Sequence, residues 1–471
     1  MTPLCSNRRS AAGHAGLLAA GALVVWCTAT WAENRTQRPN ILVLCSDQQH
    51  WRALGFFDSF FETPHQDALA REAVVFKSAF CTTPQCSPSR SSLLTGLYPH
   101  RTGMLNNVGA LGGTHLARPT LGKMLQQAGY TTGYFGKWHL GRDPVGNAGW
   151  SEQVRRGPDE ATTRRGLDFL RRHAQDEAPW VLFLMYVNPH DIYHYRPGSS
   201  SVRTDDVTLP ESWARQDFSR VPSVQKQFMT DDQGRFLWRL GEDAWKGYRD
   251  FYRQKVRLYD DQVGRVLTEL KRLGLWDETV IVATSDHGDM DTHHRLVFKG
   301  PFMYEQLIRI PMIIRVPEAF GGIGHRIVTD SHWVHVDLTP TLLDLAGIKP
   351  PDCDGRSAKP VLTGRGAVRR REFVISQYYG KQTWINPIRT IRTHRFKYNL
   401  YIEHGEELYD LKNDPGELTN LARDPTFASA KARLRRKLDQ WIAAHDDPFY
   451  TFETTPLKRR PGARPLPGET R

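Results

Sequence analysis

The most unusual stretch of the chain is a cysteine followed closely by proline and arginine. It covers residues 86–96, whose sequence is CSPSRSSLLTG. Ordinary amino-acid usage produces Cys-x-Pro-Ser-Arg in on the order of one chain in a thousand. For an arbitrary cysteine, the alternatives are a buried structural thiol or a disulfide, here with Cys81. The residues around Cys86 instead predict that it is the precursor of a nucleophile.

Two acidic stretches follow apolar runs that read as strands. They are Asp47-Gln48 after residues 40–45 and Asp286-His287 after residues 279–284. In an open parallel sheet, sites form beyond the carboxyl ends of the strands, so these side chains are expected to meet. For either aspartate alone, a helix cap or a turn is the alternative. Together with Cys86, the two stretches predict one site.

Basic side chains follow other predicted strands. Lys137 and His139 would share one face of their segment if it is extended. The alternative is a lysine stem lying along apolar surface beside a hydrogen-bonded histidine. His190 follows the apolar run 179–187, where the alternative is a loop histidine that caps a turn.

The stretch 86–96 resembles the active-site signature of the type I sulfatases, whose cysteine is oxidised to Cα-formylglycine by a dedicated enzyme. The run from Ser285 to Pro311 resembles most of a second sulfatase signature. The resemblance implies that Cys86 is the modified residue and that a formylglycine-generating maturation enzyme is a partner. A thiol ester of sulfate would be a dead-end adduct, whereas an aldehyde hydrate offers one hydroxyl to attack and another to expel sulfate. Pro88 would fix the backbone, and the Arg90 guanidinium would hold the hydrate and its metal ligands.

The resemblance also implies a single divalent cation. Its ligands would be Asp47, Gln48, Asp286, His287 and the hydrate derived from Cys86. Carboxylate and amide oxygens suit Ca²⁺, which we expect, or Mg²⁺, while the imidazole also suits Mn²⁺. The commonest family pattern has a second Asp at Gln48 and an Asn at His287. The set found here is similar to that of the choline sulfatases and phosphonate monoester hydrolases, so a phosphonate or phosphodiester substrate stays open.

The remaining roles are carried over from the family pattern. Lys137 would contact the hydrate and the sulfate, and His139 would take the proton of the second hydroxyl so that sulfate leaves. His190 would protonate the leaving oxygen with help from Lys299, and both would bind sulfate. His294 also matches a family position and is a candidate for substrate binding.

Beyond residue 40, short apolar runs alternate with longer helical patterns, which is typical of an α/β fold. Further strands are expected near 179–187, 311–316 and 373–376, and helices near 120–129, 159–174, 243–273, 335–346 and 427–445. The resemblance implies an alkaline-phosphatase-like sandwich with a large mixed, mainly parallel sheet between helices. It also implies a small α+β C-terminal subdomain with an antiparallel sheet.

The chain of 471 residues is expected to divide into four parts. They are a signal peptide (1–32), a catalytic sulfatase domain (33–365), a C-terminal subdomain (366–457) and a basic, proline-rich tail (458–471). In the signal, Arg8 and Arg9 precede an apolar stretch, 15–27, that is too short to span a bilayer. We therefore expect export to the periplasm or the medium, without stable membrane insertion.

The net charge indicates which classes of partner to expect, and the number of cysteines indicates whether disulfides stabilise the fold. The net charge of +12 indicates a solvated basic surface or attraction to polyanions, and nucleic acid is not expected for an exported chain. Of the six cysteines, two lie in the signal and one is Cys86. The three others are an odd number, which argues against a disulfide framework.

The sequence thus predicts a sulfatase that acts on a sulfated carbohydrate, whether a small molecule or an oligosaccharide. Three alternatives are a phosphonate monoester or phosphodiester hydrolase, a promiscuous enzyme that catalyses both reactions, and an inactive binder of sulfated glycans. Exposed aromatic side chains would suit stacking on sugar faces. The candidates are Trp138, Tyr193, Tyr195 and Trp384, with Tyr378 and Tyr379 close to the last of them.

Overall fold

A computed structural model describes residues 38–143, 146–199, 201–329, 331–366 and 370–458. The predicted signal peptide and all but the first residue of the predicted tail lie outside these ranges. From Arg38 onward the chain forms one compact unit. The division at residue 365 therefore stays a prediction.

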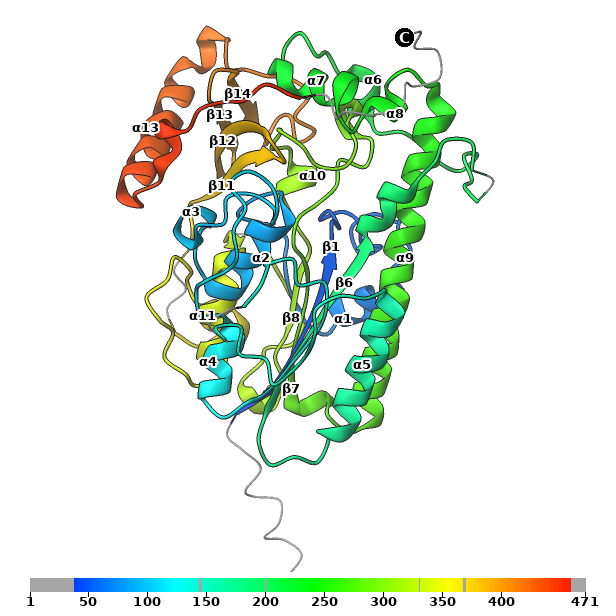
Figure 1. The fold of residues 1–471 in the computed structure, drawn as a ribbon, viewed down its shortest axis with the longest axis vertical. Helices are drawn as coiled ribbons and strands as arrows, with labels where there is room; N and C mark the ends of the chain where they lie inside the picture. Colours follow the sequence, from blue (N-terminus) through cyan, green and yellow to red (C-terminus); the bar gives the residue numbers. More distant parts are fainter. Residues whose placement is uncertain (1–37, 144–145, 200, 330, 367–369, 459–471) are drawn as a thin grey trace, which may run out of the picture. The chain divides into compact units, whose positions relative to one another are not determined.

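The central layer is a mixed, mainly parallel sheet, as expected (Figure 1). In the described part of the chain it has eight strands in the order β5-β4-β6-β1-β7-β8-β2-β9. Neighbours run parallel except where β8 meets β7 and β2. The strands are β1 (Asn40–Asp47), β2 (Val74–Phe76), β4 (Thr131–Gly136), β5 (Glu152–Val154), β6 (Trp180–Pro189), β7 (Thr279–Ser285), β8 (Met312–Arg315) and β9 (Arg326–Val328).

Helices cover both faces of this sheet (Figure 1). In the described residues the helices are α1 (Pro64–Ala70), α2 (Cys86–Thr95), α3 (Pro99–Thr102), α4 (Leu121–Gln127), α5 (Asp159–Arg172), α6 (Glu211–Arg215), α7 (Ser223–Asp231), α8 (Arg235–Trp238), α9 (Glu242–Arg272), α10 (Glu305–Ile308), α11 (Leu338–Leu345), α12 (Lys359–Thr363) and α13 (Ala428–Ala444). The helices expected from the sequence correspond to α4, α5, α9, α11 and α13.

Alternation along β1 divides the core into two parts. Leu42 and Leu44 pack into a cluster with apolar residues of α5 and α9. Ile41 and Val43 point to the other face and join a cluster that contains residues of α2, α4 and α11. Both faces of the strand are buried, and this explains why its sequence is a continuous apolar run rather than an alternating one.

Register brings the ends of three strands together. Ser46 of β1 pairs with Ser285 of β7, and Asp47 pairs with Pro189 of β6. All three strands run parallel, so their carboxyl ends lie at one edge of the sheet. The residues that follow Ser285 and Pro189 are Asp286 and His190, and both therefore start beside Asp47.

The C-terminal region adds an antiparallel sheet, as expected. Its strands, in spatial order, are β11 (Phe373–Lys381), β12 (Trp384–Thr393), β13 (Phe396–Tyr401) and β14 (Gly405–Asp410). Helix α13 packs against β12 and β13 (Figure 1). A separate short ladder pairs β3 (Ala79–Phe80) with β10 (Trp333–Val334). In the described part of the chain, no helix is both long and apolar enough to cross a membrane.

The expectation of exposed aromatic side chains is wrong for three residues. Trp138, Tyr195 and Trp384 are only 4%, 2% and 3% exposed. Trp138 packs edge-on against Tyr134, and the Tyr195 hydroxyl donates to the Ala244 carbonyl. These rings are part of the core, where an aromatic side chain buries the most apolar area.

Candidate active site

Cys86 is the first residue of α2 and lies at the centre of a group of polar side chains. Its Sγ is 3.2 Å from Lys299 Nζ, 3.3 Å from His287 Nε2, and 3.7 Å from both Lys137 Nζ and Asp47 Oδ1. In a matured chain, an oxygen of the formylglycine hydrate would lie near the position of Sγ. Cys86 and Cys81 are both free and buried. The disulfide alternative is therefore excluded.

Four buried residues could hold a metal ion together. The ligand atoms of Asp47, Cys86, Asp286 and His287 all lie within 4.8 Å of one another. Two carboxylates with an imidazole, completed by an oxygen at residue 86, suit a divalent cation. The donor set thus fits the cation that the sequence implies.

Arg90 joins the two carboxylates of this group. The guanidinium is fully buried, and it donates to Asp286 Oδ2 at 2.9 Å, Asp47 Oδ2 at 3.0 Å and the Lys137 carbonyl at 2.6 Å. A planar guanidinium suits this task because its donors diverge at fixed angles. The structure thus places the Arg90 guanidinium on the predicted metal ligands Asp47 and Asp286.

The pKa values of the two carboxyl groups are shifted in opposite directions. Burial acts to raise the pKa of Asp47, but Lys137, His190 and Arg90 together hold it below its usual value. Burial and the neighbouring Asp47 raise the pKa of Asp286. The charge of one carboxylate thus disfavours the charge of the other, and a bound cation would stabilise both.

Gln48 lies between a carboxylate and an ammonium group. Its Nε2 donates to Asp289 Oδ2 at 2.6 Å, and its Oε1 accepts from Lys299 Nζ at 2.6 Å. The side chain is buried beside the four metal-binding candidates, and its own role as a ligand stays a prediction. Asp289 belongs to the same acidic stretch as Asp286, but no role of its own is predicted for it from the sequence. It is fully buried, and this burial raises its pKa to about 7.

Lys137 and His139 both lie at the site, but the backbone that carries them is not extended as the prediction assumed. Strand β4 ends at Gly136, and His139 has a φ of 56°, so the segment is not extended and the predicted shared face is wrong. Lys137 Nζ still lies 2.5 Å from Asp47 Oδ2. His139 faces the Cys86 thiol, and its buried Nδ1 has no hydrogen-bond partner in the described residues.

His190 and Lys299 complete the surroundings of Cys86. Burial and the neighbouring Lys137 lower the pKa of His190 to about 4, whereas an anionic substrate beside it would act in the opposite direction. Burial acts to lower the pKa of Lys299 as well, but Cys86 and Asp47 raise it. The Tyr193 ring lies 4.8 Å from the His190 ring and 5.7 Å from Lys299 Nζ.

His294 makes its contacts elsewhere. Its Nδ1 lies 2.9 Å from Gln216 Oε1, and its ring stacks on Tyr304 with a centroid distance of 3.8 Å. None of the hydrogen bonds or ring contacts found for it in the described residues involves Cys86. The structure thus brings the other predicted site residues together without His294, whose part in substrate binding stays a prediction.

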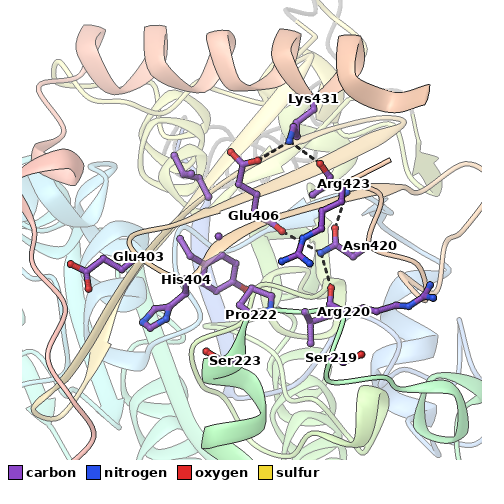
Figure 2. Close-up of a pocket in the computed structure, with 15 residues that line it drawn as sticks. Ser219, Arg220, Pro222, Ser223, Glu403, His404, Glu406, Asn420, Arg423 and Lys431 are labelled. Carbon is purple, nitrogen blue, oxygen red and sulfur yellow. Dashed lines mark hydrogen bonds and ion pairs between the residues drawn. The ribbon is translucent and has the colours of Figure 1, made fainter. Parts of the chain in front are cut away.

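A cavity of about 660 Å³ lies apart from this site and shares none of its residues (Figure 2). It lies between the start of α7, the β13–β14 hairpin and α13. Lys431 Nζ at its edge is 3.0 Å from Glu406 Oε2 and donates to the Ala422 carbonyl. Its charged groups are partly paired with one another, and none of its lining residues was predicted to be functional.

Comparison with known proteins agrees with this geometry. The sulfatase family model matches residues 39–348, and the model of the N-sulphoglucosamine sulphohydrolase C-terminal region matches residues 293–444. The Delta 4,5-hexuronate-2-O-sulfatase of Bacteroides thetaiotaomicron is 28% identical over 450 residues, which cover 90% of this chain and 92% of that protein.

Solved structures show the same fold. A 2-O GAG sulfatase superposes with a TM-score of 0.81 at 27% identity, over 89% of this chain and 95% of that one. The phosphonate monoester hydrolase of Agrobacterium radiobacter superposes with a TM-score of 0.73 at 23% identity, over 90% and 100% of the two chains.

The matched sulfatase region contains Asp47, Cys86 and Asp286, which the fold brings together at one edge of the sheet. The chain therefore belongs to the sulfatase family of the alkaline-phosphatase-like superfamily, and it is a sulfuric ester hydrolase.

Proposed function

We propose that this protein is an exported sulfatase that removes sulfate from a sulfated mono- or oligosaccharide. The observation that carries the proposal is the convergence of two ammonium groups, an imidazole and a carboxylate on Cys86 Sγ. Such a group suits an anionic tetrahedral centre placed next to a nucleophile.

The nucleophile and the metal follow from this arrangement. Formylglycine formed from Cys86 by a maturation enzyme would supply a geminal hydroxyl as the nucleophile. Asp47, Gln48, Asp286 and His287 would hold a divalent cation, for which we favour Ca²⁺ over Mg²⁺ or Mn²⁺. Its chemistry there would be to lower the pKa of that hydroxyl and to withdraw charge from the sulfuryl oxygens.

The other side chains bind the sulfate and move protons. Lys137 and Lys299, whose ammonium groups lie 3.7 and 3.2 Å from Cys86 Sγ, bind the sulfate oxygens. His190, assisted by Lys299, donates a proton to the leaving oxygen of the sugar. His139 takes the proton of the second hydroxyl, and sulfate is released.

The carbohydrate substrate is supported by the relatives and by the charge of the chain. The hexuronate-2-O-sulfatase and the 2-O GAG sulfatase act on sugar sulfates, as their names say. Residues 1–32 would deliver the enzyme to the periplasm or the medium. Without them the net charge falls from +12 to +10, because they contain two arginines and no acidic residue, and this excess would raise the local concentration of an anionic sugar.

A substrate panel tests the proposal. Sulfated mono- and oligosaccharides, 4-nitrophenyl sulfate, choline sulfate and a phosphonate monoester are assayed side by side with the mature enzyme. We expect kcat/KM to be highest for a sulfated sugar and to fall as salt is added. Preference for the phosphonate over every sulfated sugar would instead establish the alternative function on the same site.

Mass spectrometry of the same preparation tests the nucleophile. The peptide that contains residue 86 should show CH₂SH replaced by CHO, and Cys86→Ala should abolish turnover while the protein still folds. Full activity of a preparation that contains only the thiol would contradict the mechanism.

A further inference from the structure

Two buried tyrosines of α9, one helical turn apart, donate hydrogen bonds toward the active site. The Tyr252 hydroxyl donates to the Gln48 carbonyl at 2.8 Å and accepts from the His50 backbone N–H at 3.1 Å. The Tyr248 hydroxyl donates to Asp289 Oδ1 at 3.1 Å and accepts from the Phe298 backbone N–H at 3.0 Å. Each hydroxyl therefore donates one hydrogen bond and accepts one, and all four partners lie in segments that contain site residues.

These segments have an unfavourable backbone conformation. Gln48, which follows Asp47, has a φ of 77°, and Phe298, which precedes Lys299, has a φ of 56°. Residues other than glycine adopt such angles only where their surroundings enforce them. The tyrosine hydroxyls bond the Gln48 carbonyl and the Phe298 N–H directly, so they act on the two strained residues themselves.

The Gln48 amide has only one orientation that satisfies its neighbours. The Lys299 ammonium group can only donate a hydrogen bond, so the amide oxygen must face it, and the Asp289 carboxyl group accepts through its oxygens. The nitrogen must therefore face Asp289 and the oxygen must face Lys299, as observed at 2.6 Å for each contact. Asp289 is held in turn by the Tyr248 hydroxyl and by the Asp291 backbone N–H at 2.7 Å.

A continuous chain of hydrogen bonds thus links α9 to the ammonium group nearest to Sγ of residue 86. It runs from Tyr248 through Asp289 and Gln48 to Lys299, whose Nζ is 3.2 Å from that sulfur. We propose that Tyr248, Tyr252 and Asp289 are positioning residues that place Lys299 and Gln48 against residue 86. The proposal rests on the function proposed for the site and identifies what holds it in place.

Single hydroxyl deletions test the proposal. Tyr248→Phe and Tyr252→Phe each remove one oxygen atom, and Asp289→Asn keeps the shape of the side chain. Tyr259→Phe is the matched control, because Tyr259 is also fully buried in α9 but its hydroxyl has no hydrogen-bond partner in the described residues. Small displacements of a catalytic group reduce the rate by on the order of ten- to a hundredfold. We expect such a loss of kcat for Tyr248→Phe and Asp289→Asn, and no loss for the control.

A double-mutant cycle separates positioning from general stability. If Asp289 acts through Lys299, adding Asp289→Asn to Lys299→Met should reduce kcat little further. Inorganic sulfate should also inhibit Asp289→Asn more weakly than the parent enzyme. Additive losses in the cycle, or a kcat for Tyr248→Phe equal to that of Tyr259→Phe, would overturn the proposal.

The assay uses whichever substrate of the panel is hydrolysed fastest. If a phosphonate is the best substrate, the proposed sulfatase function is contradicted, but the positioning role of Tyr248, Tyr252 and Asp289 can still be tested with that substrate. If Asp289→Asn does not fold, Tyr248→Phe combined with Lys299→Met provides the same cycle.

Discussion

Arg90 is the residue on which the charge balance of the site depends. It is fully buried, and its guanidinium contacts both Asp47 and Asp286. Buried carboxylates that lose their cationic partner are strongly destabilised, because neither solvent nor another hydrogen bond replaces it. Of these two carboxylates, Lys137 contacts only Asp47. It therefore cannot replace Arg90 as the cationic partner of Asp286.

We expect Arg90→Gln to lower the free energy of unfolding by about 3–5 kcal/mol when divalent metal is removed. Urea unfolding with and without EDTA measures this change. Added Ca²⁺ should recover more stability in Arg90→Gln than in the parent protein, because the ion supplies the missing positive charge. Arg90→Lys is the control that keeps the charge without the planar geometry. Equal stability of Arg90→Gln and the parent protein in EDTA would contradict this account of Arg90.

At the scale of single elements, α2 presents Cys86 at its first position and stops at a glycine. Gly96 ends the helix with a φ of 74°, and a Cβ added there would lie 3.2 Å from Cys353 Cβ. Gly103 ends α3 with a similar φ of 76°, but a Cβ added to it would have no atom within 4 Å in the described residues. The two helix ends therefore differ in packing and share their backbone conformation.

Alanine at each glycine should separate the two effects. We expect Gly103→Ala to cost about 1 kcal/mol from the left-handed backbone alone, and Gly96→Ala to cost more because of Cys353. Thermal or urea unfolding measures both. The kcat/KM of folded Gly96→Ala should be unchanged, since Cys86 lies at the opposite end of the helix. Equal losses of stability at the two positions would show that the Cys353 contact is relaxed without cost.

At the scale of the whole molecule, the C-terminal sheet also contributes to the site. Lys381 at the end of β11 donates to the Lys299 carbonyl at 2.9 Å, and Gln85, next to Cys86, donates to the Gly380 carbonyl at 3.1 Å. The segments that carry Cys86 and Lys299 are thus both hydrogen-bonded to the C-terminal sheet. This explains why the chain from Arg38 onward forms one unit.

Buried neutral histidines should make the whole fold sensitive to acid. Burial, followed by Arg392, lowers the pKa of His332 to about 2, against about 6.5 in the unfolded chain. Below pH 6.5 the unfolded state therefore binds one more proton than the native state. Because of this residue alone, the free energy of unfolding should decrease by up to about 1.4 kcal/mol for each pH unit by which the pH is lowered below 6.5.

His332→Phe should remove this contribution. Both ring nitrogens of His332 lack a hydrogen-bond partner in the described residues, and its ring stacks on His394. An apolar ring therefore loses no bond there. Urea unfolding between pH 7.5 and 5 should show a smaller decrease in stability for the variant than for the parent protein. An unchanged slope would mean that His332 has the same pKa in the native and the unfolded protein.

Much of the fold and the centre of the site could be predicted from the sequence. The apolar runs and helical periods are local patterns, so β1, β6, β7, α5 and α9 were expected close to their observed bounds. Asp47 and Asp286 follow strands directly, and the rule for the ends of parallel strands is enough to bring them together. The residues around Cys86 are specific because they are adjacent in the chain.

Only the tertiary structure decided how the side chains are held and which of them meet. Tyr248 and Asp289 are 41 residues apart, and no period or motif links a hydroxyl on α9 to a carboxylate in a loop. The burial of Trp138 and the contacts of His294 with α6 and Tyr304 likewise depend on the elements that pack around them. Sequence patterns show which residue types can do the chemistry. Their distances and orientations depend on packing between elements far apart in the chain, because each side chain is fixed by neighbours that the local sequence does not contain.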